Sequence, residues 1–422
     1  MENIEKTVKD MALAARKAAL DIANLSAEKK NAALLCIAKH LRQNTSEILK
    51  ANTQDVEAAK QNGLSRAMVD RLTLSEKLVN SIAEGVEQVA SLENPTGRIL
   101  SETKRPNGLV IKKVSVPIGV IGIIYESRPN VTVDCAVLCL KSSNACILRG
   151  GKEAFLSNQI LAKCIRDALE ETGVCPNAVQ FIPTADRAAL NTLLKLDSQI
   201  QCIIPRGGEK LIRFVCENST IPVIKHYKGV CNLYIEKSAN LKMAKDIAVN
   251  AKCQRPSACN AAENLLVDSA IAESFLPEIC KALKEKNVEI RAMGLALEIL
   301  QKAAIPAKEA TEDDFYTEYT DYIISVAVVD GVKDACHFIN AHSSGHSDAI
   351  VSENAKAAED FLNNIDSACV YWNASTRFTD GYEFGLGAEI GISTDRLHAR
   401  GPMGLNELCS YKYKIFGTGQ TR

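Results

Sequence analysis

The stretch Val116-Pro-Ile-Gly-Val-Ile-Gly-Ile-Ile-Tyr-Glu-Ser-Arg-Pro-Asn130 decides the fold class. Its apolar run, Val120–Tyr125, has the length of one strand and is apolar on both faces. A polar turn follows, and then a helix is predicted at about 132–141. A strand without a polar face that leads into a helix is typical of a parallel sheet covered by helices.

The same alternation of strand and helix continues along the chain in two blocks. In the first block, strands are predicted at Ala145–Leu148, Val179–Ile182, Gln201–Ile204 and Val223–Ile224, with helices at about 152–172, 186–195 and 208–217. A second block is predicted to start near Ser238, with helices at about 240–251 and 271–286 and strands at 264–267, 322–329, 349–351 and 368–372. The chain therefore reads as an α/β protein whose ligands bind beyond the carboxyl ends of parallel strands.

Other segments surround this pattern. Residues 1 to about 93 have the apolar spacing of amphipathic helices. Asn107-Gly108 separates two strand-like segments, Arg98–Lys104 and Leu109–Val116, which is a hairpin signal. Tyr411–Phe416 is predicted to be an edge strand. A two-stranded ribbon is barely stable alone, so we expect this element to reach a neighbouring domain or subunit.

Composition excludes several classes of protein. With 50 basic and 51 acidic residues among 422, the net charge of −1 favours neither nucleic acid nor a membrane surface as partner. The 15 cysteines are an odd number without Cys-x-x-Cys pairs, which favours a reduced, cytoplasmic protein over a disulfide framework. No apolar signal core or membrane span is predicted.

The second informative motif is Asn250-Ala-Lys-Cys-Gln-Arg-Pro-Ser-Ala-Cys-Asn-Ala-Ala262, which precedes the apolar run Leu265–Val267. Cys259 lies in a Pro/Ser turn, with Lys252 and Arg255 close in sequence. Positive charge and turn amides stabilise a thiolate and make it a nucleophile. The other interpretation is a small buried apolar side chain, which is what most free cysteines are.

Glycines and cations also meet at two predicted strand ends, in Arg149-Gly150-Gly151-Lys152 and Arg206-Gly207-Gly208. Glycine lets backbone amides approach a phosphate, and a helix N-terminus adds partial positive charge. The two corners together favour a dinucleotide, whereas either alone is equally typical of a tight turn.

Two further patterns are rejected. The segment Gly385–Gly391 has neither the spacing nor the strand–turn–helix context of a GxGxxG motif. His342-Ser-Ser-Gly-His346 has the spacing of a metal-binding pair, but its glycine and serines favour a loop. No metal site is predicted.

Seven stretches resemble the gamma-glutamyl phosphate reductases, a branch of the aldehyde dehydrogenase superfamily, and the resemblance covers essentially the whole chain. They are Val116–Asn130, Leu148–Lys152, Ile204–Gly208, Gln254–Asn260, Trp372–Asp380, Phe384–Thr394 and His398–Pro402. The resemblance implies two doubly wound α/β domains plus a small β-hairpin oligomerisation element. We expect a cofactor-binding domain at 1–96 and 117–236 with part of 374–404, a catalytic domain at 237–373, and an oligomerisation element at 97–116 and 405–422.

The resemblance also implies roles for single residues. Cys259 matches the catalytic cysteine, and Ser127 takes the place of an oxyanion-stabilising asparagine. The cofactor is expected at Arg149, Gly150, Gly151, Lys152, Gly207 and Gly208, with Glu318 on a cofactor ribose. Arg128, Arg255 and Arg377 are candidates for the substrate's anionic groups, and Asn373 and Ser375 for its amino-acid end.

The implied reaction is the NADPH-dependent reduction of L-glutamyl 5-phosphate to L-glutamate 5-semialdehyde and phosphate through a Cys259 thioester, a step of proline synthesis. Hydrolytic aldehyde dehydrogenases carry a glutamate base in the segment corresponding to 221–231, where this chain has no carboxylate. An enzyme that must keep its thioester from water gains by lacking that base. The role of Lys225, His226 and Lys228 in that segment stays open.

Two alternatives remain: a hydrolytic NAD(P)-dependent aldehyde dehydrogenase, and a non-catalytic dinucleotide-binding protein on the same fold. As partners we expect a small-molecule substrate, further copies of the chain in a homo-oligomer, and a functional association with glutamate 5-kinase. No nucleic acid and no membrane is expected among them.

Overall fold

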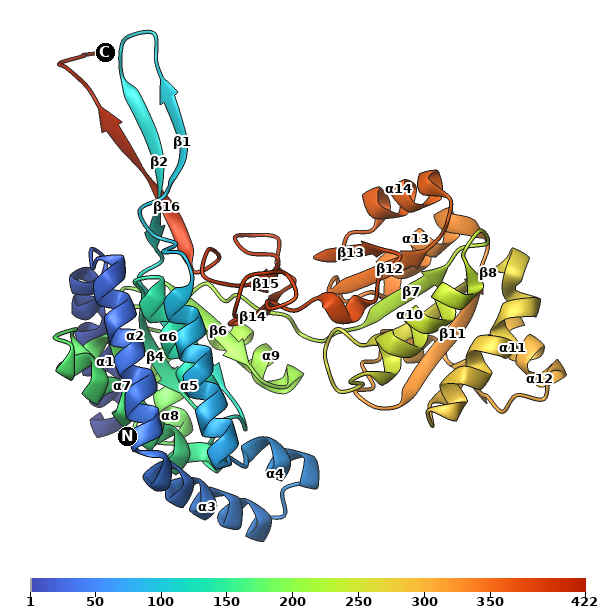
Figure 1. Ribbon diagram of the computed structural model, residues 1–422, viewed down its shortest axis with the longest axis horizontal. Coiled ribbons are helices and arrows are strands. Elements are labelled where there is room, and N and C mark those ends of the chain that lie inside the picture. The colour runs from blue at the N-terminus through green and yellow to red at the C-terminus, as the bar shows by residue number, and fades with distance from the viewer. Residues whose placement is uncertain (1) are drawn as a thin grey trace. The chain divides into compact units, whose positions relative to one another are not determined.

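The computed structural model describes residues 2–422, which form two compact units (Figure 1). Unit 1 consists of the residues up to Lys225 together with Gly385–Gly391 and Met403–Arg422. Unit 2 consists of His226–Phe384 and Ile392–Pro402. Because Gly385–Gly391 and Met403–Arg422 belong to unit 1, neither unit is a single continuous stretch of sequence.

A parallel four-stranded sheet in the order β5-β4-β3-β6 forms the centre of unit 1. Its strands are β3 (Val120–Tyr125), β4 (Ala145–Arg149), β5 (Val179–Phe181) and β6 (Cys202–Arg206). Every side chain of β3 is buried, as a central parallel strand requires. The associated helices are α6 (Asn130–Lys141), η1 (Lys152–Ala154), α7 (Phe155–Glu171), η2 (Pro176–Ala178), α8 (Arg187–Leu193) and α9 (Glu209–Asn218).

The first part of unit 1 is helical, as the apolar spacing predicts. It contains α1 (Glu2–Ile22), α2 (Ala27–Gln43), α3 (Thr45–Gln61), α4 (Arg66–Leu72) and α5 (Glu76–Ser91). Ser26, Ser65 and Ser75 each accept a hydrogen bond from a backbone N–H three residues later and so cap α2, α4 and α5. Helix α2 packs against both α5 and α7 (Figure 1).

An antiparallel ribbon of three strands completes unit 1. It consists of β1 (Ile99–Lys104), β2 (Val110–Pro117) and β16 (Cys409–Phe416), with β2 in the middle. The hairpin predicted around Asn107-Gly108 and the edge strand predicted near the end of the chain are both present. Gly108 has a φ of +90°, a backbone conformation that favours glycine.

Unit 2 is built on a parallel seven-stranded sheet in the order β10-β9-β11-β8-β7-β12-β13. Its strands are β7 (Cys231–Ile235), β8 (Ala262–Asp268), β9 (Glu289–Ala292), β10 (Lys308–Glu309), β11 (Ile323–Val329), β12 (Ser347–Val351) and β13 (Cys369–Trp372). The helices are α10 (Leu241–Cys253), α11 (Ser269–Glu285), α12 (Leu295–Lys302), η3 (Glu312–Tyr316), α13 (Gly331–His342), α14 (Ala355–Asn364) and η4 (Thr376–Phe378). The short strands β14 (Gly391–Ser393) and β15 (Gly401–Met403) pair with each other.

The predicted α/β class with parallel sheets is confirmed, but two details of the strand prediction were wrong. The second block starts earlier than Ser238, because the buried strand β7 belongs to the second sheet. The segment Val223–Ile224 makes only an isolated bridge, from Val223 to Ile203. No membrane-spanning helix is found among residues 2–422.

Candidate active site

The candidate nucleophile lies in a short turn between α10 and the buried strand β8 of unit 2. The turn is closed by backbone hydrogen bonds from Ala258 N to Arg255 O (3.1 Å) and from Ala261 N to Ala258 O (2.9 Å). The Cys259 thiol is half-buried, so it is both supported by the fold and open to a reactant. Most of the chain's other cysteines are fully buried, as apolar core residues are.

Gly229 supports this turn from behind by close backbone contact. An ideal Cβ on Gly229 would lie 1.8 Å from the Cys259 carbonyl oxygen and 2.8 Å from the Cys259 Cα. No side chain fits at that distance from backbone atoms, so glycine is required at this position for steric reasons. Gly229, which follows the basic segment Lys225–Lys228, thus has a defined structural role, which is to hold the Cys259 turn in place.

A fully buried ion pair joins the two ends of the same turn. Lys252 on the last turn of α10 contacts Glu263 at the start of β8, with 2.5 Å between Nζ and Oε2, and both side chains are 0% exposed. Glu263 Oε1 also accepts a hydrogen bond from Thr320 N (3.3 Å). Burial raises the pKa of Glu263 to about 7, although Lys252 acts in the opposite direction.

The sequence placed Lys252 among the charges that stabilise the Cys259 thiolate, and the structure corrects this: its charge is directed at Glu263. Arg377 of η4 is close enough to Cys259 for a Coulombic interaction between the two side chains. Burial and the neighbouring Arg255 lower the pKa of Arg377, while Cys259 acts in the opposite direction.

Arg377 is itself fixed against the Cys259 turn. It donates from Nε to Gln254 Oε1 (2.9 Å) and from Nη1 to Asn260 Oδ1. Asn260 in turn accepts a hydrogen bond at its backbone oxygen from Thr376 Oγ1 (2.7 Å) and donates from Nδ2 to Thr379 O (2.8 Å). Asn260, the residue after Cys259, is therefore held by two residues of η4 and by Thr379, which follows η4.

A buried chain of polar side chains behind the turn was missed by the sequence analysis. The Cys231 thiol donates to Cys259 O (3.3 Å) and lies 3.7 Å from His346 Nδ1. Ser347 Oγ lies 2.9 Å from the same His346 nitrogen and 2.6 Å from Thr379 Oγ1. These residues come from β7, the start of β12 and the segment after η4, so no local spacing could have predicted the cluster.

The two glycine corners predicted to bind phosphate lie at the carboxyl ends of β4 and β6 in unit 1. Gly208 N donates to Glu126 Oε2 (3.0 Å), so a carboxylate occupies the amide at the start of α9. A Cβ on Gly151 would lie 2.1 Å from Glu153 Oε1, and one on Gly207 would lie 2.4 Å from Glu126 Oε2. Both corners therefore already accommodate an anionic oxygen.

The two cations of the first corner differ in burial. Arg149 is half-buried, donates from Nη2 to Ala185 O (3.1 Å), and has a buried Nε without a hydrogen-bond acceptor in the structure. Burial lowers its pKa, and Glu153 and Glu126 act in the opposite direction. Lys152 is exposed at the start of η1.

Ser127 has a different set of contacts from the one its predicted role suggests. Its backbone N (2.7 Å) and hydroxyl (2.9 Å) both donate to Glu153 Oε1. Its φ of +50° is unusual for a residue with a side chain. The geometry thus ties the turn after β3 to the first glycine corner within unit 1.

The remaining candidates are spread over both units. Arg128 is half-buried next to Ser127, and Glu318 is half-buried in the loop between η3 and β11. Asn373 is already engaged, because its Oδ1 accepts from Ser352 N (2.9 Å) and its Nδ2 donates to Ser352 O (3.0 Å). Ser375 caps η4 by accepting from Arg377 N. Unit 2 thus brings together Cys259, Arg255, Ser375 and Arg377, and unit 1 holds the glycine corners with Ser127 and Arg128.

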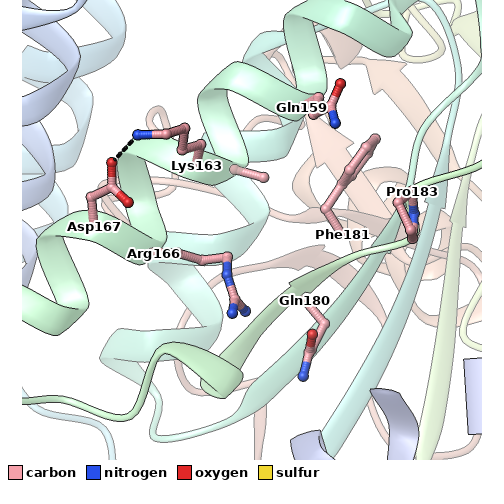
Figure 2. Close-up of a pocket in the computed structure, with 8 residues that line it drawn as sticks. Gln159, Lys163, Arg166, Asp167, Gln180, Phe181 and Pro183 are labelled. Carbon is pink, nitrogen blue, oxygen red and sulfur yellow. Dashed lines mark hydrogen bonds and ion pairs between the residues drawn. The ribbon is translucent and has the colours of Figure 1, made fainter. Parts of the chain in front are cut away.

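A separate small cavity of about 210 Å³ lies beside α7 and β5 in unit 1 (Figure 2). Its polar side chains are largely paired internally: Lys163 contacts Asp167 at 2.5 Å, and Arg166 donates to Pro176 O and Val179 O. None of the residues predicted to bind cofactor or substrate lines it.

Residues 2–293 match the model of the aldehyde dehydrogenase family. A gamma-glutamyl phosphate reductase of Opitutus terrae is 57% identical over 409 residues, which are 97% of this chain and 96% of that protein. The crystal structure of a gamma-glutamyl phosphate reductase from Thermotoga maritima has a TM-score of 0.96 at 45% identity and covers 98% of this chain and 99% of its own. A glyceraldehyde-3-phosphate dehydrogenase of Methanocaldococcus jannaschii, solved with NADP, shares the fold at 16% identity, with a TM-score of 0.69 over 98% of this chain and 95% of its own.

Proposed function

Because the chain belongs to the gamma-glutamyl phosphate reductase family of aldehyde dehydrogenases, we propose that it reduces L-glutamyl 5-phosphate to L-glutamate 5-semialdehyde and phosphate, as a step of proline synthesis. The proposal assigns the nucleophile to Cys259 and the reductant to NADPH. The observation that carries it is a half-buried thiol, held by Gly229 and η4, in electrostatic contact with Arg377.

In the first step, the Cys259 thiolate attacks the acyl carbon. A C–S bond forms, the C–O bond to phosphate breaks, and phosphate leaves with the electron pair. Arg377 favours this step because its positive charge stabilises the phosphate as it leaves. In the last step the C–S bond breaks, the Cys259 thiolate is restored and the semialdehyde leaves.

The residues of unit 1 fit the phosphates of a nicotinamide dinucleotide. A carboxylate already lies on the Gly208 amide, and the buried Arg149 Nε has no acceptor in the structure. Arg149 and Lys152 would hold a phosphate group of NADPH, and Glu318 a ribose. When bound, NADPH supplies the hydride that reduces the thioester carbonyl.

Negative charge develops on the acyl oxygen in both steps. We assign its stabilisation to the Cys259 backbone N–H and to the Ser127 hydroxyl, which must first exchange its hydrogen bond to Glu153. Loss of one donor of this kind typically costs about 3–4 kcal/mol of barrier. A Ser127→Ala enzyme is therefore expected to lose kcat rather than cofactor affinity.

The reverse reaction gives the direct test: semialdehyde, phosphate and NADP+ are supplied, and NADPH absorbance is recorded. Cys259→Ala is expected to abolish turnover and to leave NADPH binding intact, because the thiol acts after the cofactor is seated. Cys253→Ala is the matched control, since Cys253 is also half-buried and lies only six residues earlier. An alanine variant at 259 that keeps more than about a few per cent of the rate would remove Cys259 from the mechanism.

Phosphate dependence separates this function from its alternatives. A hydrolytic aldehyde dehydrogenase would turn over without phosphate, and a non-catalytic binding protein would not turn over at all. The segment 221–231 contains no carboxylate that could activate water, and its Gly229 is packed directly against Cys259. Oxidation of the semialdehyde at equal rates with and without phosphate would therefore contradict the proposal.

For substrate recognition, we assign the substrate's anionic groups to Arg255 and Arg377, with Arg128 as a third candidate, and the amino-acid end to Ser375. Asn373 is a weaker candidate because both ends of its amide contact Ser352. Arg377→Lys is expected to raise KM for semialdehyde or phosphate severalfold, because an ammonium does not reproduce two parallel guanidinium bonds to an oxyanion. An unchanged KM for both would remove Arg377 from substrate binding.

The exposed ribbon is the element we assign to homo-oligomerisation. Tyr411, Tyr413, Ile415 and Phe416 on β16 are each at least half exposed. Sedimentation of an Ile415→Asp/Phe416→Asp variant tests the assignment, since a change to monomer is expected. An association with glutamate 5-kinase would deliver the unstable acyl phosphate, and co-sedimentation with that kinase is its test.

A further inference from the structure

Three side chains with metal-binding chemistry converge on the helical face of unit 1, far from the candidate active site in sequence. One ligand atom each of Cys36, His40 and Glu171 lies within 4.8 Å of the other two. We propose that these three residues form a Zn²⁺ site that joins α2 to α7. The proposal is independent of the reductase function.

The secondary structure explains why the three side chains meet. Cys36 and His40 are four residues apart on α2 and therefore lie on the same helix face. Glu171 is the last residue of α7, which packs against α2 (Figure 1). The ligands thus come from two helices that the hydrophobic core already holds together, so little chain entropy is lost when a cation binds.

The distances suit a tetrahedral ion after small side-chain rotations. His40 Nε2 lies 2.7 Å from Glu171 Oε2, which is a hydrogen bond in the present state. Two ligands of one Zn²⁺ lie about 3.3–3.7 Å apart, given bond lengths of about 2.0–2.3 Å. The imidazole and carboxylate therefore need to separate by less than about 1 Å to admit the ion.

The chemistry of the ligand set favours zinc among divalent cations. A thiolate, an imidazole and a carboxylate form a mixed sulfur, nitrogen and oxygen set, whereas Mg²⁺ and Ca²⁺ take oxygen ligands. Cys36 is 9% exposed and the His40 side chain 15%, while the Glu171 side chain is 48% exposed. Solvent thus reaches the site from the Glu171 side, where water would complete the tetrahedron.

The charges around the site are compatible with one bound cation. His40 and Lys39 lower the pKa of Glu171 to about 2, so its carboxylate is ionised at neutral pH. Lys39 contacts Oε1 of this carboxylate at 2.9 Å and leaves Oε2 on the side of His40. Burial and Glu171 raise the pKa of the Cys36 thiol, so the metal must displace its proton on binding.

Cobalt(II) is the probe that reports both the thiolate and the geometry. All proteins carry Cys259→Ala, so that the candidate nucleophile does not bind the ion, and are full-length. With an equimolar amount of Co²⁺, this protein is expected to show a sulfur-to-cobalt charge-transfer band and intense tetrahedral d–d bands, both abolished by Zn²⁺. Zn²⁺ is also expected to raise its thermal midpoint.

Cys36→Ser is expected to remove the charge-transfer band, and His40→Gln is expected to remove the tetrahedral bands. Each variant is also expected to weaken Zn²⁺ binding by more than about tenfold. Cys216→Ser, at a half-buried thiol on α9, is the matched control and should keep both signals. If Cys36→Ser does not fold, the more exposed His40→Gln decides alone. The absence of a charge-transfer band, or an equal Co²⁺ titration in His40→Gln and Cys216→Ser, overturns the proposal.

Discussion

The buried pair Lys252–Glu263 predicts an unequal response to removing its two members. In Lys252→Met, Glu263 is left without a counter-charge but becomes neutral at little further cost, because burial has already raised its pKa to about 7. In Glu263→Gln, a fully buried ammonium is left instead without its counter-charge, and breaking a buried pair in this way typically costs about 3–5 kcal/mol. We therefore expect about 1–2 kcal/mol of destabilisation for Lys252→Met and about 3–5 kcal/mol for Glu263→Gln.

Urea unfolding at pH 7 measures both values, and the single tryptophan, Trp372, reports on the unit that contains the pair. The double variant Lys252→Met/Glu263→Gln is expected to regain most of the lost stability, since it leaves no buried charge. Lys245→Met is the matched control on the same helix: its partner Glu278 is half exposed, so less than about 1 kcal/mol should be lost. The reasoning is refuted if Lys252→Met costs as much as Glu263→Gln, or if the double variant is the least stable of the three.

The pair also has a pH signature. The folded-state pKa of Glu263, about 7, lies above its ordinary value of 4.5, so the folded protein holds a proton that the unfolded chain has released between these values. The contribution of Glu263 to stability is therefore fully present below about pH 4.5 and is lost as the pH rises towards 7. In Lys252→Met the loss of stability with rising pH is expected to remain but to occur at higher pH, because Glu263 has lost its counter-charge. In Glu263→Gln this loss is expected to be absent.

Two further predictions concern the candidate site. Gly229→Ala should lower kcat by about a hundredfold or more, because its Cβ would meet the Cys259 carbonyl at 1.8 Å and displace the turn. Gly85→Ala is the control, because a Cβ at that position meets nothing within 4 Å. Equal rates for the two variants would contradict the steric argument. Replacing both Arg149 and Lys152 by Ala should narrow the preference for NADPH over NADH in kcat/KM; an equal fall with both cofactors would leave only general phosphate binding.

The sequence was informative where the chemistry is local. Runs such as Val120–Tyr125 are apolar on both faces, so they predicted the parallel sheets, and Asn107-Gly108 predicted the hairpin turn. The strand β7 was missed because its short apolar run follows the polar segment Lys225–Lys228, and nothing in that run indicates to which sheet it belongs.

In the candidate site, too, only the features that are local in sequence could be predicted. The Cys259 turn could be predicted because its own residues are contiguous in sequence, but Arg377, which contacts the turn from η4, could not. The partner of Lys252 could not, because Glu263 reads as an ordinary strand residue until the turn brings it back to α10. Cys231 and His346 meet only because β7 and β12 are neighbours in the sheet, and strand order is a property of the folded chain.

The pairing of β16 with β2 has a consequence for the order of events during synthesis. Cys409 pairs with Pro117, so the outer strand of the ribbon leaves the ribosome 292 residues after its partner (409 − 117). At translation rates of about 5–20 residues per second, β2 waits about 15–60 s with one edge unpaired. Residues 226–384 of unit 2 are complete before that wait ends, although unit 1 was begun first. A nascent chain stalled before Cys409 is thus expected to expose the β2 edge to other chains, which makes this interval the period in which aggregation competes with folding.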